Sequence, residues 1–143
     1  MSAPHPIVGT WRLVAFWTRY DGEDRFFPLG EDALGAITYT ADGFMSGTMQ
    51  RRGVRPFAIG DRMRATAAEK ADAFDAYVTY CGRWTTEGGR FVHSIEMSLL
   101  PNWIGDRQYR DAVWHGPDRV DLVARQEAGG RGRLAVVEWE RSR

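Results

Sequence analysis

Two side chains in the second half of the chain could do acid–base or anion-binding chemistry, namely His93 and Arg110. His93 is the one polar member of an apolar odd-numbered row in residues 90–100, so we expect its side chain to point into the protein. A buried imidazole stays neutral and can accept a proton near pH 7, which suits a general base or a hydrogen-bond partner in a pocket. The alternative is a core histidine that hydrogen-bonds through one nitrogen and does no chemistry.

Arg110 belongs to a segment, residues 107–115, in which either row of side chains could face inward. One of these rows holds Gln108, Arg110 and Trp114. An arginine inside a protein needs a carboxylate or an anionic ligand group, because an unpaired buried charge is costly. Arg141, in the last segment of the chain, raises the same question. The alternative for both arginines is to extend into solvent or to pair with a carboxylate, those considered being Glu96, Asp111 and Glu138.

Other kinds of catalytic site find no support in the sequence. The single cysteine, Cys81, excludes an internal disulfide and a cysteine metal site, and it has no local cue for a lowered pKa. The three histidines are dispersed, and we find no glycine-rich phosphate loop and no serine elbow. We therefore expect neither a metal nor a cofactor.

The charge balance bears on the partners of the protein. The chain has 19 Lys and Arg against 19 Asp and Glu, so no overall field would attract nucleic acid or an anionic membrane. The first residues lack the basic and apolar regions of a signal peptide, and no stretch approaches the roughly 20 apolar residues of a membrane span. We expect a cytoplasmic protein whose partner is a small molecule, with a homodimer as an open possibility.

The elements that must position these side chains read mainly as β-strands, because apolar and polar residues alternate along most of the chain. Thr66-Ala67-Ala68-Glu69 is a capping box that predicts a short amphipathic helix over 66–76, lying on the barrel or covering one end. Residues 51–65 carry five arginines and are either a solvated loop or a basic rim. Strands are expected over 7–20, 25–28, 34–41, 44–50, 77–86, 90–100, 107–115, 119–126 and 133–141.

Short turns between so many strands favour an all-β fold, a single up-and-down antiparallel barrel of eight to nine strands over residues 1–143. Trp11 supports this fold, since Gly9-Thr10-Trp11 at the head of the first strand is typical of small closed barrels that hold apolar ligands. In the first strand the odd row through Trp17 is expected to face inward. A barrel of this size has room for side chains alone or for one small ligand.

The inferred interior is rich in aromatic and thioether groups, which suit a small apolar or aromatic molecule. Ordinary core filling is the alternative for each such residue. The candidate ligand-binding residues are Trp11, Tyr39, Met45, Tyr80, His93, Met97, Trp103, Gln108, Arg110 and Trp139.

Several segments together resemble the bacterial and fungal lipocalin-like domain family of small stand-alone barrels. The segments that carry the resemblance are Gly9–Leu13, Tyr39–Ser46, the helix start at Thr66, His93, Pro101–Gly105, and Gln108 with Arg110. The resemblance covers nearly the whole chain and implies a barrel with a pocket. It singles out His93, Asn102, Trp103, Gln108 and Arg110, with Trp103 at a corner where it would close one barrel end or gate the pocket.

Three functions remain open at this point. The first is a non-catalytic carrier of a small apolar molecule with one anionic or carbonyl group. The second is an isomerase or cyclase acting on a polyketide- or terpenoid-like substrate, in which His93 would be the acid/base and Arg110 would polarise a carbonyl. The third is a barrel with a filled interior that serves in dimerisation or partner binding.

Overall fold

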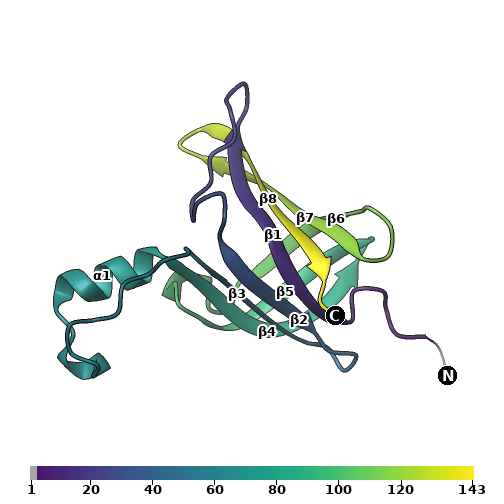
Figure 1. The fold of residues 1–143 in the computed structure, drawn as a ribbon. Coiled ribbons are helices and arrows are strands. Elements are labelled where there is room, and N and C mark those ends of the chain that lie inside the picture. The colour runs from purple at the N-terminus through teal and green to yellow at the C-terminus, as the bar shows by residue number, and fades with distance from the viewer. Residues whose placement is uncertain (1–2) are drawn as a thin grey trace.

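Eight antiparallel strands follow one another around a closed barrel in the order of the sequence, and the last strand pairs with the first (Figure 1). The structure is a computed structural model, and it describes residues 3–143. The strands are β1 Gly9–Tyr20, β2 Leu34–Tyr39, β3 Phe44–Gln50, β4 Tyr77–Glu87, β5 Arg90–Ser98, β6 Arg107–Trp114, β7 Arg119–Ala128 and β8 Arg131–Arg141. The predicted up-and-down barrel is confirmed, with eight strands. The ninth strand expected over 25–28 is reduced to a single bridge between Thr18 and Phe26.

The β2–β3 hairpin shows how local chemistry sets the register. Asp42 and Gly43 make the turn, with Gly43 at a φ of 95° that favours glycine. Thr40 Oγ1 accepts from the Phe44 amide at 2.9 Å and donates to Asp42 Oδ1 at 2.6 Å. The turn therefore brings Tyr39 opposite Met45, with both side chains in the barrel core.

Trp11 closes one end of the barrel. Its side chain is fully buried, and its indole Nε1 donates to the Ile7 carbonyl at 2.8 Å. The Arg141 guanidinium lies 4.3 Å from the centre of the Trp11 ring. Gly9 has a φ of 130°, which favours glycine, and a Cβ there would press on the Arg141 guanidinium, since it would stand 3.1 Å from Nη1.

Arg141 has several hydrogen-bond partners within the protein. It donates to Asp118 Oδ1 at 3.1 Å and to the carbonyls of Pro6, Val8 and Pro117 at 2.8–3.1 Å. Its carboxylate partner is Asp118, and not one of those considered from the sequence, because the β6–β7 turn reaches the same end of the barrel.

Two β-bulges reverse the inward-facing row within single strands. In β1 the register shifts between Leu13 and Ala15, after which the even-numbered Phe16, Thr18 and Tyr20 face the interior. The predicted inward position of Trp17 is therefore wrong. Its ring is buried on the outer face of the barrel, with Nε1 donating to Glu138 and the Arg25 guanidinium 4.1 Å above it.

The second bulge lies between Cys81 and Gly82 of β4, where the pairing moves from Met97 to Ile95 of β5. A Cβ on Gly82 would stand 2.0 Å from the Ser94 carbonyl oxygen, so this bulge needs glycine. Met97 is consequently 64 % exposed on the outer surface, and the prediction that it faces the interior is wrong.

Val92 departs from the expected pattern as well. The alternation assigns it to the solvent face, but its side chain is fully buried between its register neighbours Thr85 and Tyr109. Its strand is therefore covered on both faces at this position.

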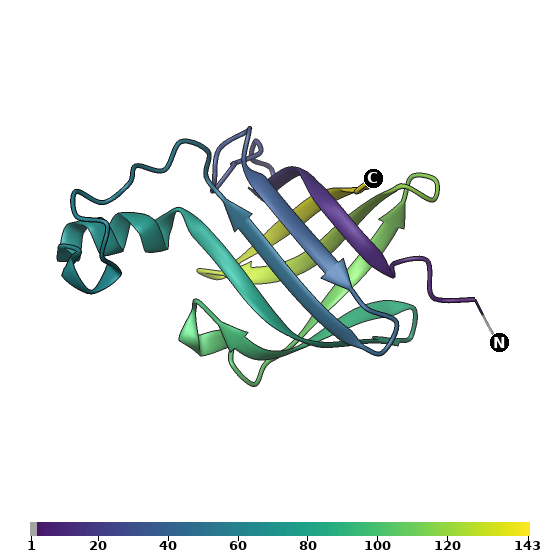
Figure 2. The same ribbon diagram turned by 60° about the horizontal axis from the view of Figure 1, so that its bottom comes forward.

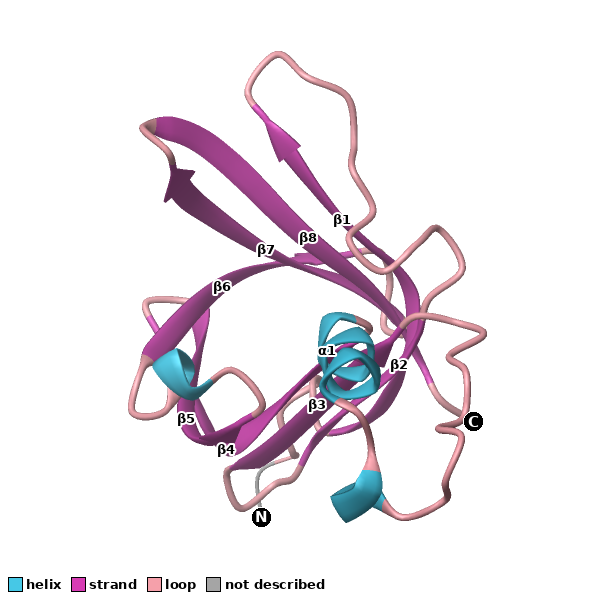
Figure 3. Cartoon of the chain, turned by 90° about the vertical axis from the view of Figure 1, so that its left-hand side faces the viewer, coloured by secondary structure: helices cyan, strands magenta, loops and turns pink. Residues whose placement is uncertain are grey.

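Residues 53–75 form an arm that projects from the barrel (Figure 2). Its helix α1, Ala67–Asp75, begins with the predicted capping box of Thr66 and Glu69. No residue of α1 is buried, and the view into the barrel shows the helix standing in front of the barrel end (Figure 3). The helix is confirmed. Of the two positions expected for it, the one on the barrel surface is not met, and its place in front of the barrel end is nearer to the other. None of the described helices is long and apolar enough to span a membrane.

Candidate ligand-binding site

A cavity of about 450 Å³ occupies the half of the barrel away from Trp11. The residues of β1 that line it, Phe16, Thr18 and Tyr20, lie in the second half of that strand, whereas Trp11 lies near its start. Since the barrel contains this cavity, its interior is open rather than filled. The hypothesis of a filled barrel thus loses its structural basis.

Six of the ten candidate residues lie on the cavity wall, and four do not. Trp11, Tyr39 and Met45 belong to the hydrophobic core beside the cavity, and Met97 lies outside the barrel. The six on the wall are Tyr80, His93, Trp103, Gln108, Arg110 and Trp139.

The sequence reasoning missed a group of wall residues near the ends of the strands. Gln126 and Arg133 are register partners on β7 and β8, and Arg133 donates to Gln126 Oε1 through two nitrogens at 2.9 and 2.6 Å. They continue the rows of Leu122 and Ala135, so extending these rows to the strand ends would have found them. The other missed residues include Phe16, Thr48 and Val78.

His93 is fully buried and both of its ring nitrogens have a tyrosine partner. The Tyr39 hydroxyl lies 2.8 Å from Nε2, and the Tyr80 hydroxyl lies 2.8 Å from Nδ1. Burial, and then the nearby positive charge of Arg110, lower the pKa of His93 to about 3, so the imidazole is neutral near pH 7. A histidine with both nitrogens occupied is poorly placed to act on a substrate directly, which weakens its predicted role as an acid/base.

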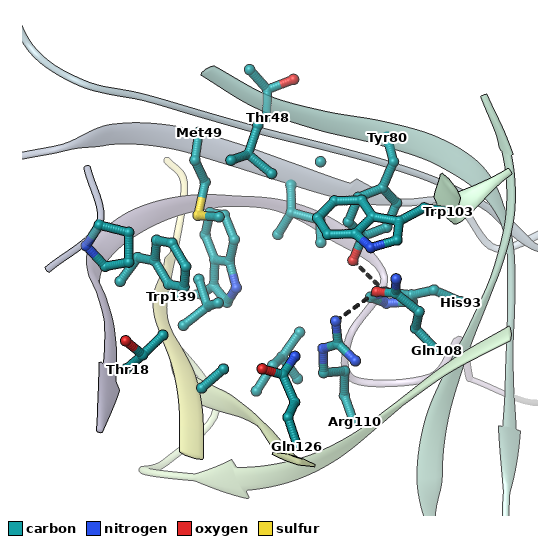
Figure 4. Close-up of a pocket in the computed structure, with 18 of the residues that line it drawn as sticks. Thr18, Thr48, Met49, Tyr80, His93, Trp103, Gln108, Arg110, Gln126 and Trp139 are labelled. Carbon is teal, nitrogen blue, oxygen red and sulfur yellow. Dashed lines mark hydrogen bonds between the residues drawn. The ribbon is translucent and has the colours of Figure 1, made fainter. Parts of the chain in front are cut away.

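Arg110 points into the cavity from β6 (Figure 4). Its Nη2 donates to Gln108 Oε1 at 2.7 Å and its Nη1 donates to the Tyr109 carbonyl at 2.9 Å. None of the ion pairs formed within residues 3–143 involves Arg110. Of the two rows that the sequence left open in 107–115, the even one faces inward, and it places a guanidinium without a carboxylate partner on the cavity wall.

Tyr80 joins the Arg110 group to the His93 group. Burial raises the pKa of the Tyr80 hydroxyl, and the positive charge of the adjacent Arg110 guanidinium opposes that rise. Trp103, at the end of the short helix Pro101–Trp103, packs edge-on against the Tyr80 ring, with 5.8 Å between the ring centres. One part of the wall is thus polar, and aromatic rings border it.

The rest of the described wall is mostly apolar, apart from the Gln126–Arg133 pair near the ends of β7 and β8. Trp139 lies on the side of the cavity away from His93 and Gln108 in Figure 4, with Met49 above it. Within residues 3–143 no group of three His, Cys, Asp or Glu side chains could hold a metal ion. The arrangement can enclose an apolar body and offer hydrogen-bond donors to a polar group at one side.

A closed antiparallel barrel with an open interior and a tryptophan plug near its N-terminus is a lipocalin-like architecture. The chain belongs to the lipocalin-like domain family, whose model matches residues 8–142. The 4'-hydroxy-3'-methoxypropiophenone carrier protein ppsC of Aspergillus oryzae is 36 % identical over an alignment 74 residues long, and the match covers 46 % of this chain and 67 % of that protein.

Two solved structures of designed proteins are also similar. A redesigned β-barrel matches with a TM-score of 0.45 and 10 % identity, over 96 % of this chain and 93 % of that one. A de novo designed fluorescence-activating β-barrel matches with a TM-score of 0.41 and 15 % identity, over 94 % of this chain and 93 % of that one.

Proposed function

We propose that this protein is a carrier that binds a small apolar or aromatic molecule with one carbonyl or anionic oxygen. The observation that carries the proposal is the Arg110 guanidinium, which faces an apolar cavity without a carboxylate partner in the described chain. A charge held in this way is stabilised when a ligand supplies the missing oxygen.

The size and lining of the cavity support the same class of ligand. Its volume of about 450 Å³ lies within the range of small-molecule pockets, roughly 300–1,000 Å³. Aromatic rings of Trp103, Tyr80 and Trp139 offer flat surfaces for a ring or a planar chain. The relative from Aspergillus oryzae is named as the carrier of an aryl ketone, a molecule of this class.

Calorimetric titration of the purified protein with 4'-hydroxy-3'-methoxypropiophenone and with 3-phenylpropionate tests the proposal. We expect saturable binding of at least one of them, and a loss of affinity of about tenfold or more in Arg110→Met, because a hydrogen bond to a charged group is removed. Arg12→Met is the matched control, since Arg12 is exposed on the outer face of β1 and its contact with Glu140 is 3.9 Å long. Absence of binding by both ligands, or equal affinity in wild type and Arg110→Met, would contradict the proposal.

A further inference from the structure

Three side chains form a continuous chain of hydrogen bonds from the barrel core to the cavity wall. Tyr39 is 1 % exposed and belongs to the core, His93 is fully buried in the middle, and Tyr80 lines the cavity. The two contacts, Tyr39 to His93 Nε2 and Tyr80 to His93 Nδ1, both measure 2.8 Å. The direction of the hydrogen bond between Tyr39 and His93 therefore determines the direction of the one between His93 and Tyr80.

The number of protons limits this chain to two arrangements. A neutral imidazole has one N–H donor and one acceptor nitrogen. In the first arrangement His93 Nε2–H donates to Tyr39, and Tyr80 donates to Nδ1. In the second, Tyr39 donates to Nε2, and His93 Nδ1–H donates to the Tyr80 oxygen.

The surroundings of Tyr39 distinguish these arrangements. In the first, the Tyr39 proton has no acceptor among residues 3–143, where His93 is its side-chain hydrogen-bond partner. A buried donor without an acceptor is costly, whereas the second arrangement satisfies both Tyr39 and His93. The second arrangement leaves the Tyr80 proton free to be donated into the cavity.

Arg110 adds a second donor at the same point of the wall. Its guanidinium lies beside the Tyr80 hydroxyl, and two of its N–H groups are used by Gln108 and the Tyr109 carbonyl. A guanidinium has five N–H donors and no acceptor, so others remain for a ligand. Tyr80 and Arg110 together thus present donors to the cavity.

We infer that Tyr80 and Arg110 bind one acceptor oxygen of the ligand, and that Tyr39 and His93 are positioning residues that hold Tyr80 as a donor. The oxygen is that of a carbonyl, a carboxylate or a phenolate. The inference rests on the proposed carrier function and names the chemistry that the site selects.

A pair of ligands that differ only in this oxygen tests the inference. Propiophenone and propylbenzene share their ring and chain length, and only the ketone has an acceptor. We expect Tyr80→Phe to lower the affinity for propiophenone about five- to tenfold and to leave the affinity for propylbenzene unchanged. Tyr109→Phe is the matched control, because Tyr109 lies on the outer face of β6 between Arg90 and Arg107.

The possible failures of this experiment are distinguishable. If neither ligand binds to the wild-type protein, the carrier function fails and the inference fails with it. If both bind and Tyr80→Phe changes their affinities by the same factor, the inference alone is overturned.

A spectroscopic measurement tests the proton arrangement directly in the wild-type protein. Long-range ¹H–¹⁵N spectra of the histidine side chains, with the His93 signals assigned by their loss in His93→Gln, should show the proton on Nδ1. In Tyr39→Phe the hydroxyl that donates to Nε2 is gone, so the Nε2–H form of His93 should become populated. The affinity for propiophenone should then fall more than the affinity for propylbenzene. An Nε2–H form in the wild-type protein would overturn the inference. An unchanged His93 tautomer and an unchanged affinity for propiophenone in Tyr39→Phe would show that Tyr39 is not a positioning residue.

Discussion

The closed end of the barrel and the cavity each hold an arginine, and the two arginines differ sharply in their partners. Arg141, at the closed end, has a carboxylate, three backbone carbonyls and the face of Trp11 as partners. Arg110, at the cavity, has one side-chain amide oxygen and one carbonyl. The first set is complete within the protein, while the second has room for a group from outside.

This difference separates residues that stabilise the fold from residues that are available to a ligand. Groups at the closed end exchange water for protein partners during folding, so their loss should be seen in the free energy of unfolding. Groups at the cavity keep unfilled hydrogen-bonding capacity, so their loss should be seen in binding. Variants at matched positions of the two ends can test this division.

The largest effect is expected for Trp11→Ala at the closed end. Removal of this fully buried indole leaves a large hole and should lower the free energy of unfolding by about 3–5 kcal/mol. The matched variant Trp103→Ala, whose ring covers Tyr80 at the cavity, should cost about 1–2 kcal/mol because the side chain is only partly buried. Urea denaturation of both variants measures the difference, and equal losses would contradict the division.

The two arginines give the next effect in size. Arg141→Met should lower the free energy of unfolding by about 2–3 kcal/mol, since it leaves Asp118 and several carbonyls without their charged donor. Arg110→Met should change it by less than about 1 kcal/mol, because few partners are lost and methionine suits the apolar wall. The same denaturation experiment checks both, and a larger loss for Arg110→Met would show that Arg110 serves the fold.

His93 lies between the core residue Tyr39 and the cavity residue Tyr80, and it gives an effect that depends on pH. Its pKa in the folded protein is about 3, below the ordinary value of 6.5, so below pH 6.5 the unfolded chain takes up a proton that the folded protein does not. The stabilisation by neutral His93 is therefore fully present above pH 6.5 and is lost as the pH falls toward 3. Between pH 6.5 and 5 this contribution should decrease by about 1–2 kcal/mol.

Comparison with His93→Gln isolates that contribution, because other titrating groups are shared. The free energy of unfolding of the wild-type protein should fall more steeply over this interval than that of the variant. Parallel curves would mean that His93 has the same pKa in the folded protein as in the unfolded chain.

The alternation of side chains predicts the barrel, the β2–β3 hairpin and the inward position of His93, because each depends on neighbouring residues along one strand. It fails beyond Leu13 in β1 and beyond Ile95 in β5, where a bulge adds a residue to one strand. A bulge is decided by the pairing with the next strand, which the pattern of a single strand does not contain.

The partners of the cavity groups are just as hard to predict. Tyr39 and His93 are 54 residues apart in the sequence, and only the closed barrel brings them into contact. Gly82 is the one local sign of the second bulge, since a glycine inside a strand often marks such a site.

The smallest effect is expected at Met97, where the second bulge alone decides the outcome. Because the bulge turns this side chain outward, Met97→Gln should change the free energy of unfolding by less than about 0.5 kcal/mol and leave the affinity for propiophenone unchanged. Met45→Gln is the matched control, since Met45 is buried in the core and a polar amide there should cost about 2 kcal/mol or more. Comparable losses for the two variants would place Met97 inside the barrel and contradict the bulge. A small loss for Met97→Gln beside a large one for Met45→Gln would show that a single extra residue in β5 separates the cavity wall from the outer surface.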